Sequence, residues 1–201
     1  MSKFEFPPSI KSRPTYGTLE PRNGTAHLFI ADAQGAQAVI DVCQKDPSIA
    51  KFAHIIFIPK GEDELAEDLA ELGAAQLYVG PTYEAAISRI RHVLRDAKMG
   101  LQIYLAGSEG LMGQAQNEAV NAGYPHTAIQ SEHRGSTARR MQCVHCKGIT
   151  EDVETDPFVC AHCGLNLFVR DHYSRRLAAF QGVCIDAEDH GNVPEQKGIY
   201  E

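Results

Sequence analysis

Between residues 26 and 130, short apolar runs alternate with longer stretches in which apolar and polar residues mix at helical spacing. The apolar runs have the length and composition of buried strands, and they cover residues 26–31, 54–58, 76–79, 101–106 and 127–130. The stretches between them predict helices over residues 35–45, 61–72, 83–98 and 111–121. Apolar strands joined by crossover helices favour a parallel sheet that is covered on both faces. The pattern therefore predicts an α/β fold, a Rossmann-like domain over residues 26–134 that follows an extended segment, residues 1–25.

The chain changes character after this domain. Residues 135–140 are polar and basic and predict a linker to a cysteine-rich stretch, residues 141–169. Four cysteines there form two C-x2-C pairs separated by thirteen residues: Cys143, Cys146, Cys160 and Cys163. In each pair the two thiolates converge on one side of a tight turn, called a knuckle, and two knuckles complete a tetrahedron around a metal ion at metal–sulfur distances of about 2.3 Å. Gly164 suits the second knuckle because glycine accepts the positive φ that such turns often need, whereas the first knuckle has its glycine, Gly148, one place later.

The four cysteines predict a structural zinc site, a zinc ribbon whose metal supplies much of the folding free energy that so small a module lacks. A rubredoxin-like iron centre that carries electrons is the main alternative, because four thiolates suit iron as well, and disulfides are a third. Since four thiolates already close a tetrahedron, we expect His145 and His162 to be surface residues. We expect Cys43 and Cys184, which stand outside the pairs, to be small buried side chains.

Charge and apolar content exclude several classes of function. The formal net charge is −7, so the chain lacks the broad positive surface of a general nucleic-acid-binding protein. The longest apolar runs are far shorter than the roughly 18 residues of a membrane span. We therefore expect a cytoplasmic protein that binds neither nucleic acid nor membranes. The charge is uneven, because residues 133–180 are net positive and both flanking parts are net negative.

Positive charge gathers at the start of the C-terminal tail, residues 170–201. Three arginines, one histidine and one tyrosine fall within seven residues there: Arg170, His172, Tyr173, Arg175 and Arg176. Arginine pairs with carboxylates and phosphates through two parallel hydrogen bonds, so we predict that these five residues bind a partner. The alternative is a solvated basic helix start that is capped by Asp171 or Ser174.

The run Ala106-Gly107-Ser108, followed by Met112 and then by Gly123-Tyr124-Pro125, resembles the late strand-to-helix signature of ferredoxin-reductase-type flavoenzymes. The resemblance covers residues 26–134. It implies the pyridine-nucleotide domain of such enzymes.

The turn after the first strand departs from that family. The family has a glycine-rich turn there, which lets the backbone approach the cofactor pyrophosphate, whereas this chain keeps only Gly35 and places the carboxylate of Asp32 near any bound phosphate. Lys60 stands where such folds often carry a basic nucleotide contact, and Ala106 replaces the redox cysteine of the family. We therefore expect a degenerate nucleotide domain that packs against partners. Weak NAD(P)H binding, or an anion on the backbone N–H groups at Ser108, is the alternative.

A second resemblance covers residues 139–201. It is carried by the segments Arg139 to Cys146, Cys160 to Leu165, Phe168 to Leu177 and Phe180 to Val183, in which V-R-D-H-Y-S-R-R-L follows a C-x2-C pair. Together these segments resemble the small DmmA-type subunit of bacterial dimethylamine monooxygenase, which is a narrow family.

The second resemblance implies a place in a multi-subunit, haem-dependent oxidative N-demethylase that converts dimethylamine, NAD(P)H and O2 to methylamine and formaldehyde. It implies partner subunits for the haem, for FMN with a [2Fe–2S] cluster, and for tetrahydrofolate, since none of these cofactors has an evident home in this chain. We expect a zinc-containing assembly subunit that joins the reductase and haem subunits and is not catalytic by itself. A rubredoxin-like iron electron carrier in the same complex is the alternative, and a nucleotide sensor and a nucleic-acid adaptor are further ones.

Overall fold

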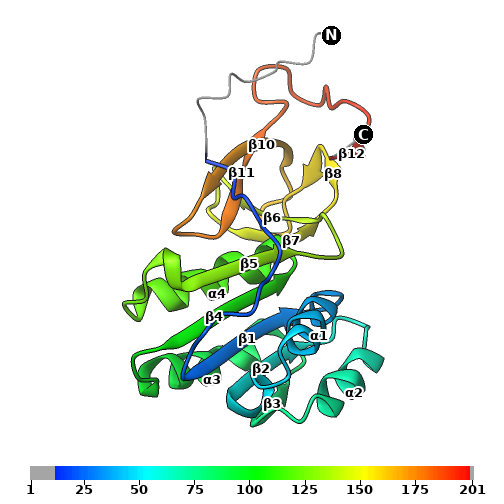
Figure 1. Ribbon diagram of the computed structural model, residues 1–201. Coiled ribbons are helices and arrows are strands. Elements are labelled where there is room, and N and C mark those ends of the chain that lie inside the picture. Colours follow the sequence, from blue (N-terminus) through cyan, green and yellow to red (C-terminus); the bar gives the residue numbers. More distant parts are fainter. Residues whose placement is uncertain (1–11, 200–201) are drawn as a thin grey trace. The chain divides into compact units, whose positions relative to one another are not determined.

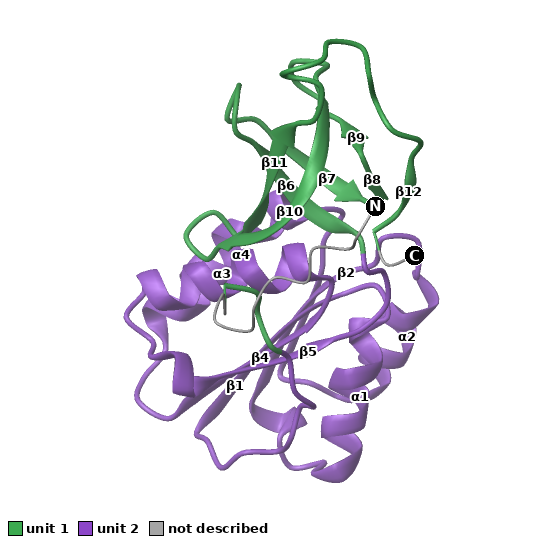
Figure 2. Ribbon diagram, turned by 90° about the horizontal axis from the view of Figure 1, so that it is seen from above, with its two compact units in different colours: residues 1–15, 138–201 green, residues 16–137 purple. Residues whose placement is uncertain are grey.

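The computed structural model describes residues 12–199, which form two compact units. Figure 2 shows the larger unit, residues 16–137, and the smaller unit, to which residues 12–15 and 138–199 belong. Residues 1–11 of the expected N-terminal segment lie outside the described residues. Within the described chain, no helix has both the length and the apolar content that crossing a membrane requires.

The larger unit is built on a five-stranded sheet in the order β3-β2-β1-β4-β5, and all four neighbouring pairs are parallel (Figure 1). Its strands are β1 (Ala26–Asp32), β2 (Ala53–Ile58), β3 (Gln76–Val79), β4 (Leu101–Gly107) and β5 (Ile129–His133). Its helices are α1 (Gly35–Lys45), α2 (Glu64–Glu71), α3 (Tyr83–Asp96), α4 (Glu109–Asn121) and the short 3-10 helices η1 (Ala50–Phe52) and η2 (His126–Ala128). The strand order reverses between β1 and β4, as it does in doubly wound sheets. The expected Rossmann-like α/β fold is confirmed.

Successive residues of β1 point to opposite faces of the sheet. Phe29 and Ala31 pack with residues of α1 and α2, including Leu69. Leu28 and Ile30 pack with residues of α3 and α4 on the other face. Because both faces are covered, the strand reads as a continuous apolar run without alternation.

Two helices begin at residues that differ from the expected ones. Helix α2 begins at Glu64, and the predicted start at residue 61 is wrong because Lys60 and Gly61 both have positive φ, which a right-handed helix does not allow. Helix α4 begins at Glu109 because the hydroxyl oxygen of Ser108 accepts the N–H of Leu111 as an N-cap at 3.4 Å. Both starts are therefore set by the turn that precedes the helix.

The smaller unit contains a second five-stranded sheet, in the order β7-β6-β11-β10-β9. Its strands are β6 (Arg139–Cys143), β7 (Ile149–Val153), β9 (Phe158–Val159), β10 (Asn166–Ser174) and β11 (Ala179–Cys184), and the separate pair is β8 (Thr155–Asp156) with β12 (Lys197–Gly198). Strands β6 and β11 run parallel, and the other pairs are antiparallel. The core of this sheet includes Met141, Leu167 and Phe180.

The sheet continues beyond the end expected for the metal module. The boundary at residue 170 falls inside β10, and β11 then inserts between β10 and β6. The alternative of a capped helix start at this point is wrong, because residues 170–174 are extended. The chain can turn back at once because Ala178 takes a positive φ of 50° at the end of the turn. Residues 170–184 are therefore part of the sheet rather than of a separate tail.

Candidate metal centre

The sulfur atoms of Cys143, Cys146, Cys160 and Cys163 lie within 4.8 Å of one another. The Sγ atoms of Cys143 and Cys163 are 3.9 Å apart, and those of Cys146 and Cys160 are 3.7 Å apart. A tetrahedral metal ion with bonds of about 2.3 Å to four sulfurs separates those sulfurs by about 3.8 Å. The cluster therefore fits one tetrahedral ion, and its four thiols are the soft donors that zinc and iron accept.

The two knuckles have the same backbone hydrogen bonding. The N–H of Lys147 donates to the carbonyl of Cys143 at 3.0 Å, and the N–H of Gly164 donates to the carbonyl of Cys160 at 3.0 Å. Lys147 and Gly164 also share positive φ, 64° and 73°. The expectation for Gly164 is confirmed, but in the first knuckle this conformation is taken by Lys147 and not by Gly148.

Gly148 instead makes room for His162. A Cβ atom at Gly148 would lie 2.4 Å from the imidazole carbon Cδ2 of His162, so only glycine allows this approach. The Nε2 of His162 is 2.7 Å from the carbonyl oxygen of Ile149, to which it donates. A second link runs from the N–H of Ala161 to Oγ1 of Thr150 at 3.2 Å. His162 is exposed, as expected, and it also joins the second knuckle to the backbone that follows the first.

The thiols differ strongly in acidity. Burial raises the pKa of Cys160, but hydrogen bonds from the backbone N–H groups of Cys163 and His162 and from neighbouring thiols outweigh it and lower the pKa to about 6. The N–H of Leu165 lowers the pKa of Cys163, but burial and hydrogen bonds with the other three thiols raise it to about 12. A proton therefore leaves Cys160 more readily than Cys163, and thiolate is the form that binds metal.

Outside the cluster, four of the five residues expected to bind a partner are exposed: Arg170, His172, Arg175 and Arg176. Tyr173 is a correction, because it is only 8% exposed and its ring packs edge-on against Phe180 with centroids 4.9 Å apart. The register of β10 against β11 shifts between Arg170 and Tyr173, which turns the tyrosine into the core. We call the four exposed residues the basic surface.

An ion pair between a buried arginine and an exposed aspartate supports the basic surface. Arg139 is 3% exposed, donates to the carboxylate of Asp171 at 2.7 Å, and lies over the ring of Phe180 at 4.4 Å. Arg140 donates to the carbonyl of Leu177, in the turn that carries Arg175 and Arg176. These contacts hold the turn and the strand end in place. No local pattern in the sequence predicts these contacts, because they join residues more than thirty positions apart.

At the carboxyl edge of the larger sheet, Asp32 occupies the place where a dinucleotide-binding fold holds a phosphate. Asp32 is fully buried and accepts the N–H of Ser108 at 2.7 Å and the hydroxyl of Ser108 at 2.5 Å. Lys60, expected as a nucleotide contact, lies 3.1 Å from the same carboxylate. A Cβ at Gly107 would lie 1.9 Å from Asp32 Oδ1, which shows how little space remains. These residues do not fit a cofactor pyrophosphate, because the chain's own carboxylate fills the position.

Gly35 keeps one role of the glycine-rich turn. A Cβ atom there would lie 2.3 Å from the carbonyl oxygen of Ala106, so Gly35 permits close packing of α1 on β4. Buried Cys43 matches its expectation, and burial raises its pKa to about 11, which makes it unreactive. Cys184 is only half-buried, and its thiol donates to Oδ1 of Asp186 at 3.2 Å.

Comparison with known proteins gives matches over both units. The curated heme-dependent oxidative N-demethylase delta subunit of Ectopseudomonas mendocina (strain ymp) is 35% identical over 95 residues, which are 47% of this chain and 54% of that protein. The chain thus matches about half the length of this relative.

Solved structures are more distant. An intact type IV self-sufficient cytochrome P450 monooxygenase matches with a TM-score of 0.43 and 21% identity over 60% of this chain and 17% of its own. The flavohemoglobin of Malassezia yamatoensis matches with a TM-score of 0.41 and 17% identity over 56% of this chain and 32% of its own. The flavohem-like FAD/NAD binding domain of nitric oxide dioxygenase from Vibrio cholerae O1 biovar El Tor matches with a TM-score of 0.39 and 16% identity over 62% of this chain and 56% of its own.

Two family descriptions cover most of the chain. Residues 8–129 match the N-terminal domain, and residues 140–183 match the C-terminal domain, of the family described as dimethylamine monooxygenase subunit DmmA-like. The chain therefore belongs to the DmmA-like family of dimethylamine monooxygenase subunits.

Proposed function

We propose that this chain is a zinc-containing accessory subunit of a haem-dependent oxidative N-demethylase, in which it joins the reductase subunit to the haem subunit. The complex uses NAD(P)H and O2 to convert dimethylamine to methylamine and formaldehyde. The chain is not catalytic by itself, and partner subunits hold the haem, the FMN with its [2Fe–2S] cluster, and the tetrahydrofolate. Membership of the DmmA-like family supports this place in the complex.

The proposal of an accessory role rests on the closed donor set of the cysteine cluster. Four sulfurs complete a tetrahedron and leave no position for a substrate, whereas a catalytic zinc site keeps one position open. A zinc ion on these cysteines links the β6–β7 turn to the segment between β9 and β10, so that its binding free energy becomes folding free energy. We place the complex in the cytoplasm, a reducing compartment in which paired cysteines bind metal rather than form disulfides.

The basic surface is the proposed contact with partner subunits. Its side chains are exposed, and the turn that carries Arg175 and Arg176 is held by Arg140. Arginine binds carboxylates with two parallel hydrogen bonds, so acidic surfaces on the haem or reductase subunit suit it.

An iron electron carrier is the second candidate, and the exposure of Cys146 favours it. An ion held by this cysteine lies close to the surface, where electrons can pass to a partner. The same four sulfurs bind iron in the same geometry, so the distances do not separate the two metals.

Metal analysis with a visible spectrum of the purified full chain separates these two functions. We expect one zinc per chain and no visible band. Cys146→Ser should release the zinc, whereas Cys43→Ser, which changes a buried thiol of the larger unit, should retain it. One iron per chain, with a thiolate-to-iron band that dithionite bleaches, would establish the electron carrier instead.

Co-purification with the haem and reductase subunits tests the assembly role. We expect the double change Arg175→Glu and Arg176→Glu to release the chain from the complex. Arg95→Glu with Lys98→Glu makes the same change of charge on exposed residues of the larger unit and should leave the complex intact. A complex that survives the first pair of changes would rule out the basic surface as the contact.

A further inference from the structure

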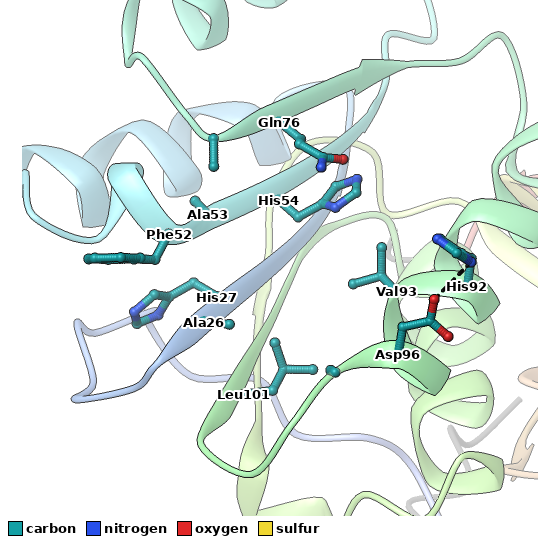
Figure 3. Close-up of a pocket in the computed structure, with 12 residues that line it drawn as sticks. Ala26, His27, Phe52, Ala53, His54, Gln76, His92, Val93, Asp96 and Leu101 are labelled. Atoms are coloured by element: carbon teal, nitrogen blue, oxygen red, sulfur yellow. Dashed lines mark ion pairs between the residues drawn. The ribbon is translucent and has the colours of Figure 1, made fainter.

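A cavity of about 320 Å³ opens at the amino edge of the larger sheet (Figure 3). Its lining comes from the first residues of β1, β2, β3 and β4 and from the end of α3. Asp32 and Ser108 lie at the carboxyl ends of β1 and β4, so this cavity is at the opposite edge from the filled phosphate position. It contains no residue of the cysteine cluster or of the basic surface.

The cavity has apolar walls and a small number of polar groups. Figure 3 shows Val93 of α3 and Leu101 of β4 pointing into the space that His54 of β2 borders. Phe52, which is 61% exposed, adds an aromatic ring at the side. Pockets for small molecules combine an apolar lining with a few placed polar groups, and their volumes begin at about 300 Å³. With a volume at the lower end of that range, this cavity has room for a ligand of one ring.

His54 supplies a hydrogen-bond donor of fixed orientation. Arg89 donates through Nε to Nε2 of His54 at 3.0 Å, and the same arginine donates through Nη2 to Oε1 of Gln76 at 2.7 Å. A guanidinium can only donate, so Nε2 of His54 accepts and its single ring proton lies on Nδ1. Among the described residues, no group accepts that Nδ1–H.

The charges around the cavity favour a neutral ligand. The guanidinium of Arg89 beside His54 repels a cation, and Asp96, on the rim, is already paired with His92 at 3.3 Å and with Arg95 at 2.8 Å. Burial, and then the charges of Arg89 and His92, lower the pKa of His54 to about 4, so the imidazole carries no charge that could bind an anion. Arg89 is not among the residues that line the cavity, and two of its N–H groups already donate to His54 and Gln76, so it offers an anion no direct contact there.

We propose that this cavity binds a small neutral compound with one aromatic or heteroaromatic ring and a carbonyl-type acceptor. The acceptor takes the Nδ1–H of His54, and the ring packs between Val93 and Leu101. The site is independent of the proposed assembly function, because its residues belong neither to the cysteine cluster nor to the basic surface, on which that function rests.

Benzamide is the probe for a first test, because it carries one ring and one neutral carbonyl. It is titrated into the millimolar range against the full chain, with methyl groups and histidine ring nitrogens followed by NMR. We expect saturable shifts at Val93, Leu101 and the His54 ring. Toluene, which lacks the acceptor, and benzoate and benzylamine, which carry charge, should each bind at least about fivefold more weakly.

Variants separate the cavity from non-specific binding. Val93→Phe fills the cavity and should weaken benzamide binding at least tenfold, whereas Val120→Phe makes the same change on α4, outside the cavity, and should not. If Val93→Phe does not fold, Ala97→Leu replaces it in this test, because Ala97 is a half-buried residue of the cavity lining and a leucine there also fills the cavity. His54→Phe removes the donor and should weaken benzamide about tenfold but leave toluene unchanged.

Three results would overturn the proposal. They are the absence of saturable shifts with benzamide, equal losses in Val93→Phe and Val120→Phe, and stronger binding of a charged probe. If benzamide does not bind and Val93→Phe weakens co-purification with the haem and reductase subunits, the cavity receives a partner's side chain instead. A failure of the cysteine and arginine tests, in contrast, leaves this site untouched.

Discussion

Replacing Asp32 by asparagine removes the negative charge that Ser108 and Lys60 contact at the carboxyl edge of the larger sheet. The carboxylate is fully buried and accepts two hydrogen bonds from Ser108, at 2.7 and 2.5 Å, and it pairs with Lys60 at 3.1 Å. Hydrogen bonds to a charged group contribute about 1.5–3 kcal/mol each. Removing one member of a buried ion pair costs about 3–5 kcal/mol, but the Lys60 side chain is 41% exposed and regains water, which reduces the loss. We expect a loss of about 2–4 kcal/mol in the free energy of unfolding.

Urea unfolding followed by helical ellipticity measures this loss in the larger unit, because all the α-helices of the described chain lie there. Ser108→Ala should cost about 2 kcal/mol, since it removes one bond to the carboxylate and the N-cap of α4. The double variant should lose about 1–2 kcal/mol less than the sum of the single ones, because both changes break the same contact.

Asp41→Asn is the control for the loss of a charge. Asp41 and Arg134 form a pair at 3.2 Å in which both side chains are 37% exposed, so this change should cost less than about 1 kcal/mol. A loss below about 1 kcal/mol for Asp32→Asn, or strictly additive single changes, would refute the inference that the hydrogen bonds between Ser108 and the buried carboxylate of Asp32 stabilise the larger unit.

Three further predictions concern packing, the knuckles and pH. Gly35→Ala should destabilise the larger unit by about 1–3 kcal/mol in urea unfolding, because its Cβ meets the Ala106 carbonyl oxygen at 2.3 Å, whereas Gly73→Ala, which has open space and only a positive φ, should cost about 1 kcal/mol. Gly148→Ala should lower the temperature at which the cysteine cluster releases zinc, as detected with a chromogenic chelator, because the new Cβ meets the His162 ring. Adding His162→Ala to this variant removes the ring and should restore part of the lost release temperature. If the double variant is no better than Gly148→Ala, the contact is not the cause. The pKa of His54 is lowered from 6.5 to about 4, so between these pH values the unfolded chain binds a proton that the folded chain does not. The free energy of unfolding should therefore fall as the pH decreases from about 6.5 towards 4. His54→Phe should flatten this part of a pH series of urea-unfolding measurements.

Local patterns in the sequence determined the strands and helices of the larger unit and the four residues of the cysteine cluster. The apolar runs mark the parallel strands because burial on both faces leaves no polar position in them. The C-x2-C spacing marks the knuckles because both thiols of a pair belong to one turn, whose geometry depends on a few neighbouring residues. The basic surface was found by composition alone, since exposed side chains need no particular neighbour.

Tertiary structure alone decided which residues meet across long distances in the chain. Strand β11 pairs with β6, and this pairing turned an expected tail into the middle of a sheet. The register shift in β10 buried Tyr173, which the sequence placed among exposed basic residues. Asp32 meets Ser108 across 76 positions, and His54, Val93 and Leu101 meet around one cavity. Sequence periodicity shows which face of an element is buried, but the partner on that face is chosen by strand order and register, because only their combined packing satisfies the buried groups of both.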